Sequence, residues 1–235
     1  MIVLKSKDEI ETMAKAASVT AQMLVELPEV IVPGMSTRDI DEWVEHYIRK
    51  HGMKPAFKGY GGFPASACVS VNEEVVHGIP SKRRILREGD IVSVDLGTIY
   101  EGYYSDAART YPVGKISDEH ARLIKVAEES FFEGLKYCRK GNRLRDVSHA
   151  IQQHVEAAGF GVIRDYVGHG VGRNLHEVDD VGQSDAEHER PEALFQPPFR
   201  HSPSTDDATK QQANDAQCAI DEAEIHIAQA QATFG

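Results

Sequence analysis

The chain has 235 residues, 41% of them hydrophobic, which is enough for one large domain or two small ones. Its net charge of −11 argues against nucleic acid and anionic membranes as main partners. Scattered cysteines and a short N-terminal apolar run argue against a disulfide framework, a secretory signal and a membrane span, so we expect a cytoplasmic protein.

The first part of the chain has the pattern of two helices. Apolar residues recur at helical spacing over 5–27, and Pro33-Gly34 breaks the pattern. A second helix is predicted to begin after the capping residue Ser36 and to end at His51-Gly52. Two short strands with a glycine-rich aromatic loop between them are then expected over 53–57, 58–64 and 65–71.

Residues 91–106, IVSVDLGTIYEGYYSD, are predicted to form a β-hairpin, because β-branched residues flank a turn signal. Folding the segment about Tyr100-Glu101 places Asp95 directly opposite Asp106, with Cβ atoms about 4.5–5.5 Å apart. Two carboxylates at this distance repel each other unless a proton or a cation lies between them, so the pair is a candidate metal site. The alternative is two exposed strand aspartates without a ligand.

The two halves of the chain are predicted to be repeats of one another. A shift of 107 residues places Gly34 on Gly141 and Gly52 on Gly159. Coincidence is the alternative, since start and stop residues recur in any helix, but the equal spacing favours duplication. Each unit is helix, helix, strand, and two units predict a two-layer α/β fold with a curved antiparallel sheet and helices outside it. The second unit comprises helices over 117–135 and 145–158 and a strand over 161–167.

Three histidines complete a possible reaction site. His169 lies between two glycines, which let the backbone approach closely and hold the imidazole, a common metal ligand, at a fixed angle. His176 suits a group that hydrogen-bonds a developing oxyanion, and His77 precedes a turn. Each alone is more often structural or exposed. Together with the two aspartates they suit metal-assisted hydrolysis, in which the metal lowers the pKa of a bound water and neutral imidazoles orient the substrate.

At these residues the sequence resembles the type I methionine aminopeptidases. The likeness is carried by NEEVVHGIP at 72–80, GDIVSVDLGTIYEGYYSDAART at 89–110 and YVGHGVGRNLHE at 166–177. It implies the pita-bread aminopeptidase fold, an α/β arrangement with a pseudo-twofold axis, whose C-terminal part is incomplete here.

The resemblance also implies a role for individual side chains. Three fall on metal ligands of the family: Asp95, Asp106 and His169, with Asp106 bridging two metal ions. Two histidines fall on substrate-contacting catalytic residues: His77 and His176. Four further side chains would line the pocket for the methionine side chain, an apolar and sulfur-tolerant lining: Tyr60, Phe63, Cys68 and Leu175.

The implied reaction is removal of the initiator methionine from nascent proteins whose second residue is small. The family holds two divalent metal ions per subunit, and Co, Mn, Fe, Zn and Ni all suit Asp and His ligands. We expect N-terminal methionyl peptides as substrates, met at the ribosome by a monomer, with no nucleic-acid readout and no membrane partner.

The likeness ends near residue 178. The family continues with two strands that carry one glutamate ligand each, and we identify no counterpart of either strand. We therefore expect a truncated aminopeptidase domain over 1–178 and a divergent tail over 179–235, disordered or partly helical, as a frameshift or fusion would produce.

Without the two glutamates, one metal ion is expected rather than two. The alternative function is a catalytically impaired or inactive pita-bread protein that binds peptides or partners. A prolidase-type or creatinase-type dipeptidase is a third reading, but it would need an added N-terminal domain.

Overall fold

The computed structural model of the chain describes residues 4–163 and 168–177. The expected tail over 179–235 and most of the strand expected over 161–167 lie outside the described residues, and 161–163 are not in a strand. The elements in chain order are α1 (Lys7–Val30), α2 (Thr37–Lys50), β1 (Lys54–Pro55), the 3-10 helix η1 (Tyr60–Gly62), β2 (Ala67–Val71), β3 (Ile91–Leu96), β4 (Thr98–Tyr100), β5 (Tyr103–Tyr104), β6 (Ala107–Pro112), α3 (Asp118–Leu135) and α4 (Leu144–Ala157).

Helix α2 begins where the sequence predicts. The Ser36 side chain accepts a hydrogen bond from the backbone N–H of Asp39, and the Asp39 carboxylate accepts one from the backbone N–H of Ser36. This reciprocal pair satisfies two donors at the helix start and places an anion at the positive end of the helix dipole. The helix buries one apolar face, on which Ile40, Val44 and Ile48 are fully buried.

The internal duplication is visible in the helices. Helices α2 and α4 each have 14 residues, and a shift of 107 residues carries the first residue of α2 (37) to that of α4 (144) and the last (50) to the last (157). The matched glycines share a left-handed backbone, with φ of 91° at Gly34 and 100° at Gly141. Agreement of both boundaries and of this uncommon conformation supports a true repeat rather than the coincidental recurrence of helix start and stop residues.

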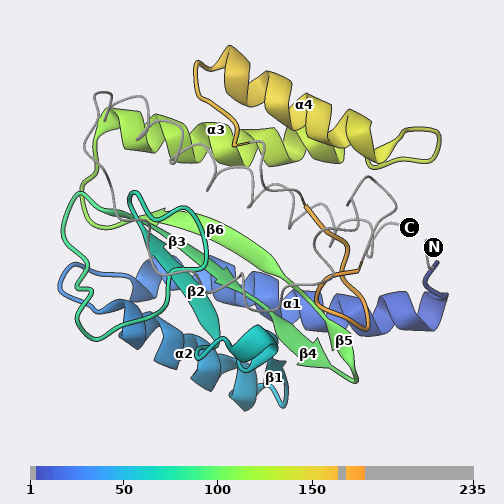
Figure 1. Ribbon diagram of the computed structural model, residues 1–235, viewed down its shortest axis with the longest axis horizontal. Coiled ribbons are helices and arrows are strands. Elements are labelled where there is room, and N and C mark those ends of the chain that lie inside the picture. The colour runs from blue at the N-terminus through green and yellow to red at the C-terminus, as the bar shows by residue number, and fades with distance from the viewer. Residues whose placement is uncertain (1–3, 164–167, 178–235) are drawn as a thin grey trace.

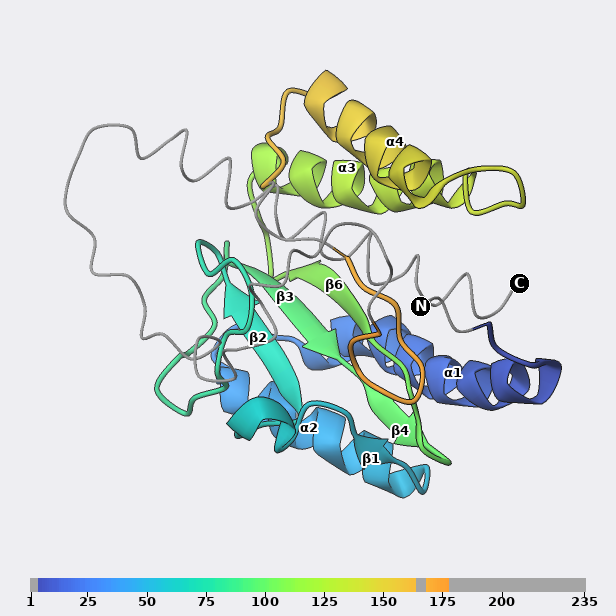
Figure 2. The same cartoon turned by 45° about the vertical axis from the view of Figure 1, so that its right-hand side comes forward.

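The strands form two antiparallel sheets of three, in the orders β2-β3-β6 and β1-β4-β5. Helices α1 and α2 lie along one side of the strands, and α3 and α4 lie side by side beyond β6 (Figures 1 and 2). The main core fills the space between the first pair of helices and the sheet, with Met23, Leu27, Val69 and Val92 among its buried side chains. The α/β class with antiparallel sheets is therefore as predicted.

The register of the hairpin differs from the predicted one. The turn lies at Glu101-Gly102, where both residues have positive φ, and Asp95 is the Cα partner of Ala108. The prediction that Asp95 lies directly opposite Asp106 is therefore wrong by two residues. Because side chains alternate between faces with a period of two, this even shift keeps Asp106 on the same face, as a diagonal neighbour of Asp95.

Gly97 allows the hairpin strands to approach at the level of the two aspartates. A Cβ atom there would lie 2.2 Å from the backbone oxygen of Ser105 and 3.0 Å from the Cβ of Ala56. We expect Gly97→Ala to destabilise the fold by about 1–3 kcal/mol, measured by urea unfolding, because a backbone atom must move. Gly102→Ala is the comparison, since its Cβ would meet nothing within 4 Å and only the positive φ opposes it. A smaller loss at Gly97 than at Gly102 would contradict this account.

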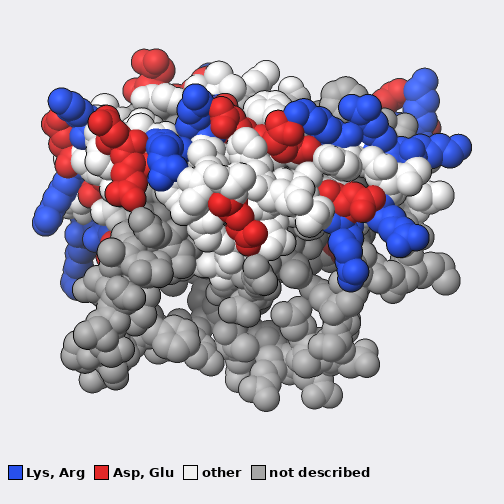
Figure 3. All heavy atoms as spheres, turned by 90° about the horizontal axis from the view of Figure 1, so that it is seen from above, with Lys and Arg blue, Asp and Glu red and all other residues white. Residues whose placement is uncertain are grey.

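The surface over α3 and α4 mixes both signs of charge (Figure 3). Two ion pairs on α3 and its C-terminal end illustrate the pattern: Lys125 with Glu129, and Lys136 with Glu133. Within the described ranges, no helix is long and apolar enough to cross a membrane.

Candidate active site

Asp95 and Asp106 form a close carboxylate pair at the centre of the sheet. Asp95 lies on β3, with Cys68 of β2 and Ala108 of β6 as its Cα partners. Asp106 directly precedes β6 and is only 3% exposed. The two side chains share a hydrogen bond.

The electrostatics of this pair are unfavourable for two free anions. Burial raises the pKa of Asp106 well above its usual value, and the charge of Asp95 and the shared hydrogen bond raise it further. A bound divalent cation would stabilise the doubly ionised pair, because its positive charge compensates the two negative charges.

The glycine loop brings His169 to the carboxylates. Its Nε2 lies 3.6 Å from Oδ2 of Asp106, and its Nδ1 lies 3.1 Å from the backbone oxygen of Gly170. The loop is closed by the backbone N–H of Glu177, which donates to the oxygen of Gly170, and it is tied to β5 by Tyr104 N–H, which donates to Gly172. Residues more than 60 positions apart in sequence thus converge on one point.

His176 lies beside His169, with ring centroids 4.2 Å apart. The hydroxyl of Tyr60 is 2.8 Å from Nδ1 of His176, so the aromatic loop and the glycine loop meet at this histidine. Although part of the ring reaches solvent, loss of hydration, followed by the charges of His169 and His77, lowers the pKa of His176 from 6.5 to about 4. His176 is therefore a neutral imidazole at physiological pH.

Loss of hydration lowers the pKa of His77, which favours its neutral form. Its backbone is left-handed, with φ of 58°, an uncommon conformation for a residue with a side chain. The next residue explains the local shape. Gly78 accepts a hydrogen bond from Val69 N–H and donates one to Ser70, and a Cβ at Gly78 would lie 2.3 Å from the oxygen of Val69. The strand edge of β2 therefore holds His77 in place.

Three of the four residues predicted to line an apolar pocket pack together. Phe63, Cys68 and Leu175 are buried members of one cluster, together with Ala56 and others. Tyr60 is at the rim, 40% exposed, where it contacts His176. Contacts thus link eight of the nine predicted residues in one region, and His77 lies next to Gly78, which is bonded to β2.

Sequence reasoning missed a clamp that holds the glycine loop to the start of α1. Glu177 makes an ion pair with Lys5, and its carboxylate accepts a hydrogen bond from the backbone N–H of Arg173. Arg173 stacks over the ring of Tyr103, whose hydroxyl donates to Glu9. These partners are up to 172 residues apart, so no local pattern could have revealed them.

The clamp is expected to weaken in acid. The hydrogen bond from Tyr103, followed by those from Ser6, lowers the pKa of Glu9 from 4.5 to about 2. The folded chain therefore holds this carboxylate ionised where the unfolded chain would protonate it, so its contribution to stability is complete above pH 4.5 and is lost as the pH falls towards 2. The Tm gap between the native chain and Glu9→Gln should shrink as the pH falls from about 6 to about 3. A gap that stays constant would exclude the effect.

The residues present suit a divalent metal ion. Two donor atoms on one tetrahedral ion, each about 2.1 Å away, lie about 3.4 Å apart, close to the observed separation of Nε2 of His169 and Oδ2 of Asp106. Carboxylate and imidazole donors are also of the type that divalent metal ions bind. Among the described residues, however, no three His, Cys, Asp or Glu side chains are near enough to form a complete metal-binding group, so the fit is one of donor type and of this one spacing.

Known proteins match the chain over most of its length. The profile of metallopeptidase family M24 matches residues 11–197. A methionine aminopeptidase of Clostridium acetobutylicum is 54% identical over 181 residues, 77% of this chain and 72% of that protein. Methionine aminopeptidase 1 of Bacillus subtilis is 50% identical over 181 residues, 77% of this chain and 73% of that protein.

Solved structures give the same result for the fold. The methionine aminopeptidase of Thermotoga maritima superposes with a TM-score of 0.74 at 52% identity, covering 76% of this chain and 72% of that one. The prolidase of Pyrococcus horikoshii superposes with a TM-score of 0.67 at 26% identity, but the match covers only 51% of its length. The fold is therefore shared with both groups, and the sequence likeness is much greater to the first.

Proposed function

The chain belongs to metallopeptidase family M24, and we propose that it removes the initiator methionine from nascent proteins whose second residue is small. Relatives that are about half identical over 77% of the chain carry the name of this activity. The observation within the chain that carries the proposal is the buried Asp95–Asp106 pair with His169 beside it. We infer a cytoplasmic monomer that meets its substrates at the ribosome.

Asp95, Asp106 and His169 would hold the metal. A bound divalent ion would supply Lewis-acid chemistry, lowering the pKa of water and polarising the scissile carbonyl. We infer one or two ions of Co, Mn, Fe, Zn or Ni. The carboxylate pair would confine positive charge to the buried end of the site, and the apolar cluster next to it would exclude bulk water from the reacting bond.

His176 and His77 would orient the peptide. When the hydroxyl of Tyr60 donates to Nδ1 of His176, the ring proton lies on Nε2, which is then free to donate to a carbonyl oxygen. A neutral donor suits an oxygen that gains negative charge during attack, because the hydrogen bond strengthens as the charge develops. Phe63, Cys68 and Leu175 would receive the methionine side chain.

Turnover of a Met-Ala-Ser peptide by the purified 235-residue chain tests the proposal. Release of methionine that requires added manganese or cobalt, and stops with a chelator, would support it. Release from a Met-Leu-Ser peptide at an equal rate would contradict the preference for a small second residue.

The same assay distinguishes an active enzyme from a protein of the same fold with an impaired site, which is the alternative because we identify no counterpart of the family's two glutamate ligands. A pita-bread protein with an impaired site would bind the methionyl peptide without cleaving it. Peptide binding that needs no added metal, with no release of methionine, would favour this alternative.

A further inference from the structure

The aromatic loop between β1 and β2 is a compact turn held at its centre by its own backbone. Gly59 N–H donates to the oxygen of Phe63, and Phe63 N–H donates to the oxygen of Tyr60. Three of its glycines have positive φ, which permits this tight path. Because these bonds are internal, they fix the shape of the loop but not its position relative to the site. Its two ends must be held by something else.

The C-terminal end of the loop is held by Asp41 of α2. Oδ1 of Asp41 accepts hydrogen bonds from the backbone N–H groups of Ser66, at 2.7 Å, and Ala67, at 3.0 Å. Ala67 is the first residue of β2, and Cys68, the next one, is the Cα partner of Asp95. The carboxylate therefore determines where the loop ends and where the strand that borders the site begins.

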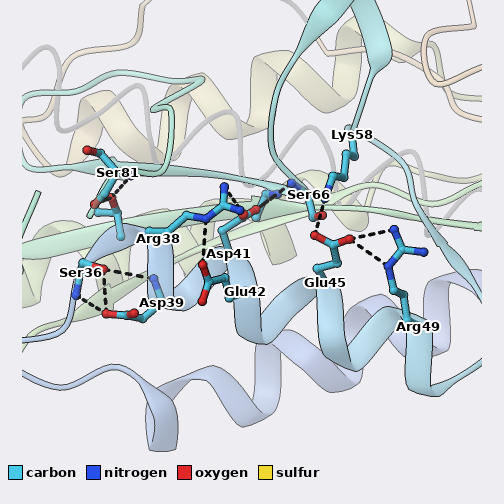
Figure 4. A network of polar contacts seen from close by, with 12 residues as sticks. Ser36, Arg38, Asp39, Asp41, Glu42, Glu45, Arg49, Lys58, Ser66 and Ser81 are labelled. Carbon is cyan, nitrogen blue, oxygen red and sulfur yellow. Dashed lines mark hydrogen bonds and ion pairs between the residues drawn. The ribbon is translucent and has the colours of Figure 1, made fainter. Parts of the chain in front are cut away.

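The N-terminal end of the loop is held one helical turn further along the same helix. Oε2 of Glu45 lies 2.6 Å from Nζ of Lys58, and Oε1 of Glu45 lies 2.7 Å from a guanidinium nitrogen of Arg49. Residues four apart share one face of a helix, so both carboxylates point toward the loop from α2. Figure 4 shows the two contacts on neighbouring turns, with Ser66 and Lys58 reaching down to them.

The burial of Asp41 sets it apart from an ordinary helix surface residue. Its side chain is 1% exposed, and Arg38, at 3.1 Å from Oδ2, supplies a neighbouring positive charge. Burying a carboxylate is unfavourable unless partners in fixed positions compensate its charge and satisfy its oxygen atoms. The carboxylate fixes the position of two backbone N–H groups, which an aliphatic side chain could not do.

We propose that α2 positions the substrate loop through Asp41, with Glu45 as a weaker second anchor. The inference rests on the proposed function, because it treats Tyr60 and Phe63 as substrate-contacting residues. The effect extends beyond the pocket, since the hydroxyl of Tyr60 bonds to His176 and a displaced loop would also move that imidazole. Asp41 and Glu45 act through the loop and are positioning residues.

The test compares Asp41→Ala, Asp41→Asn and Glu45→Gln with Glu42→Gln in the full chain. Glu42 is the matched control, because it lies on the same helix and pairs with the same Arg38 but is 52% exposed, and within the described part of the chain it forms no hydrogen bond or ion pair with the loop. The readouts are KM and kcat for the Met-Ala-Ser peptide, binding of free methionine by calorimetry, and hydrogen exchange of the amides over 58–67.

For Asp41→Ala we expect KM and the methionine Kd to rise by about tenfold or more, with faster exchange over 58–67, because two charge-assisted hydrogen bonds are lost. Asp41→Asn should recover most of the loss, since its amide oxygen can accept the same N–H groups. Glu45→Gln should have a smaller effect, because its partly exposed ion pair with Lys58 is screened by solvent. Glu42→Gln should match the native chain.

Unchanged KM, methionine binding and loop exchange in folded Asp41→Ala would overturn the proposal, as would equal losses in Glu42→Gln. If Asp41→Ala does not fold, Glu45→Gln decides: amide exchange over 58–67 and methionine binding that both stay at the native level in that variant would overturn the proposal. A native chain that neither cleaves nor binds methionyl peptides would refute the proposed function instead. The exchange data would then still judge whether α2 anchors the loop.

Discussion

Replacing Asp106 by asparagine is expected to weaken binding of manganese or cobalt by at least about 100-fold and to remove measurable turnover. Asparagine has nearly the same shape but carries no negative charge, and it cannot give the cation a second anionic donor beside Asp95. Calorimetric titration with the metal alone and the rate of methionine release measure the two effects separately. Asp118→Asn, at the start of α3 and away from the sheet, is the control for the change of residue type.

The same substitution should not unfold the protein when metal is absent. Burial and the charge of Asp95 both disfavour an ionised Asp106, so a neutral amide should be tolerated there at least as well as the carboxyl group that it replaces. We expect the Tm of metal-free Asp106→Asn to equal or exceed that of the native chain. A variant that is folded and still binds the metal as tightly as the native chain would remove the carboxylate pair from the proposed site.

The sequence was most informative where structure is set by neighbouring residues. The capping pair at Ser36 and Asp39 marks the start of α2, and the helix predicted over 145–158 agrees with α4 to within one residue at each end. Such signals depend on contacts between residues three or four apart, which the chain makes before any tertiary packing forms.

The register of the hairpin was harder to predict from the sequence, because the turn segment itself is ambiguous. The segment Tyr100-Glu101-Gly102 permits more than one two-residue turn, and the structure uses Glu101-Gly102, because a glycine at the second position accepts the positive φ that this turn requires. A shift of two residues preserves the face of each side chain. Asp95 and Asp106 therefore still lie on the same face of the sheet, although the predicted pairing was wrong by two residues.

The contacts that hold the loops in place could not be predicted from the sequence. Asp41 directly follows Ile40, a buried apolar residue of α2. Its spacing of three residues from Val44 is the only feature of the sequence that indicates its burial. Its partners at Ser66 and Ala67 are backbone amides, which leave no mark on residue identity. The pairing of Lys5 with Glu177 likewise joins two surface-type residues whose proximity depends on the completed fold.

The role proposed for His176 differs from that of the carboxylates, and this difference can be measured. His176→Asn is expected to lower kcat by about 100-fold to 1000-fold, the loss typical when a donor to a developing oxyanion is removed. Affinity for manganese or cobalt should stay within about twofold, because the side chain does not belong to the proposed ligand set. Tyr60→Phe, which removes the hydroxyl bonded to Nδ1, should lower kcat by only about tenfold, since the imidazole remains but loses its fixed orientation.

The order of these effects separates the possible roles. A metal ligand affects cation binding first and turnover as a consequence, whereas an oxyanion donor affects turnover while cation binding is preserved. If His176→Asn weakens metal binding as strongly as Asp106→Asn, the histidine is a ligand, and its contact with His169 at 4.2 Å reflects a shared ion. If turnover is unchanged in His176→Asn, the neutral imidazole beside Tyr60 has no part in the reaction, and charge on the substrate must be stabilised by His77 or by the metal alone.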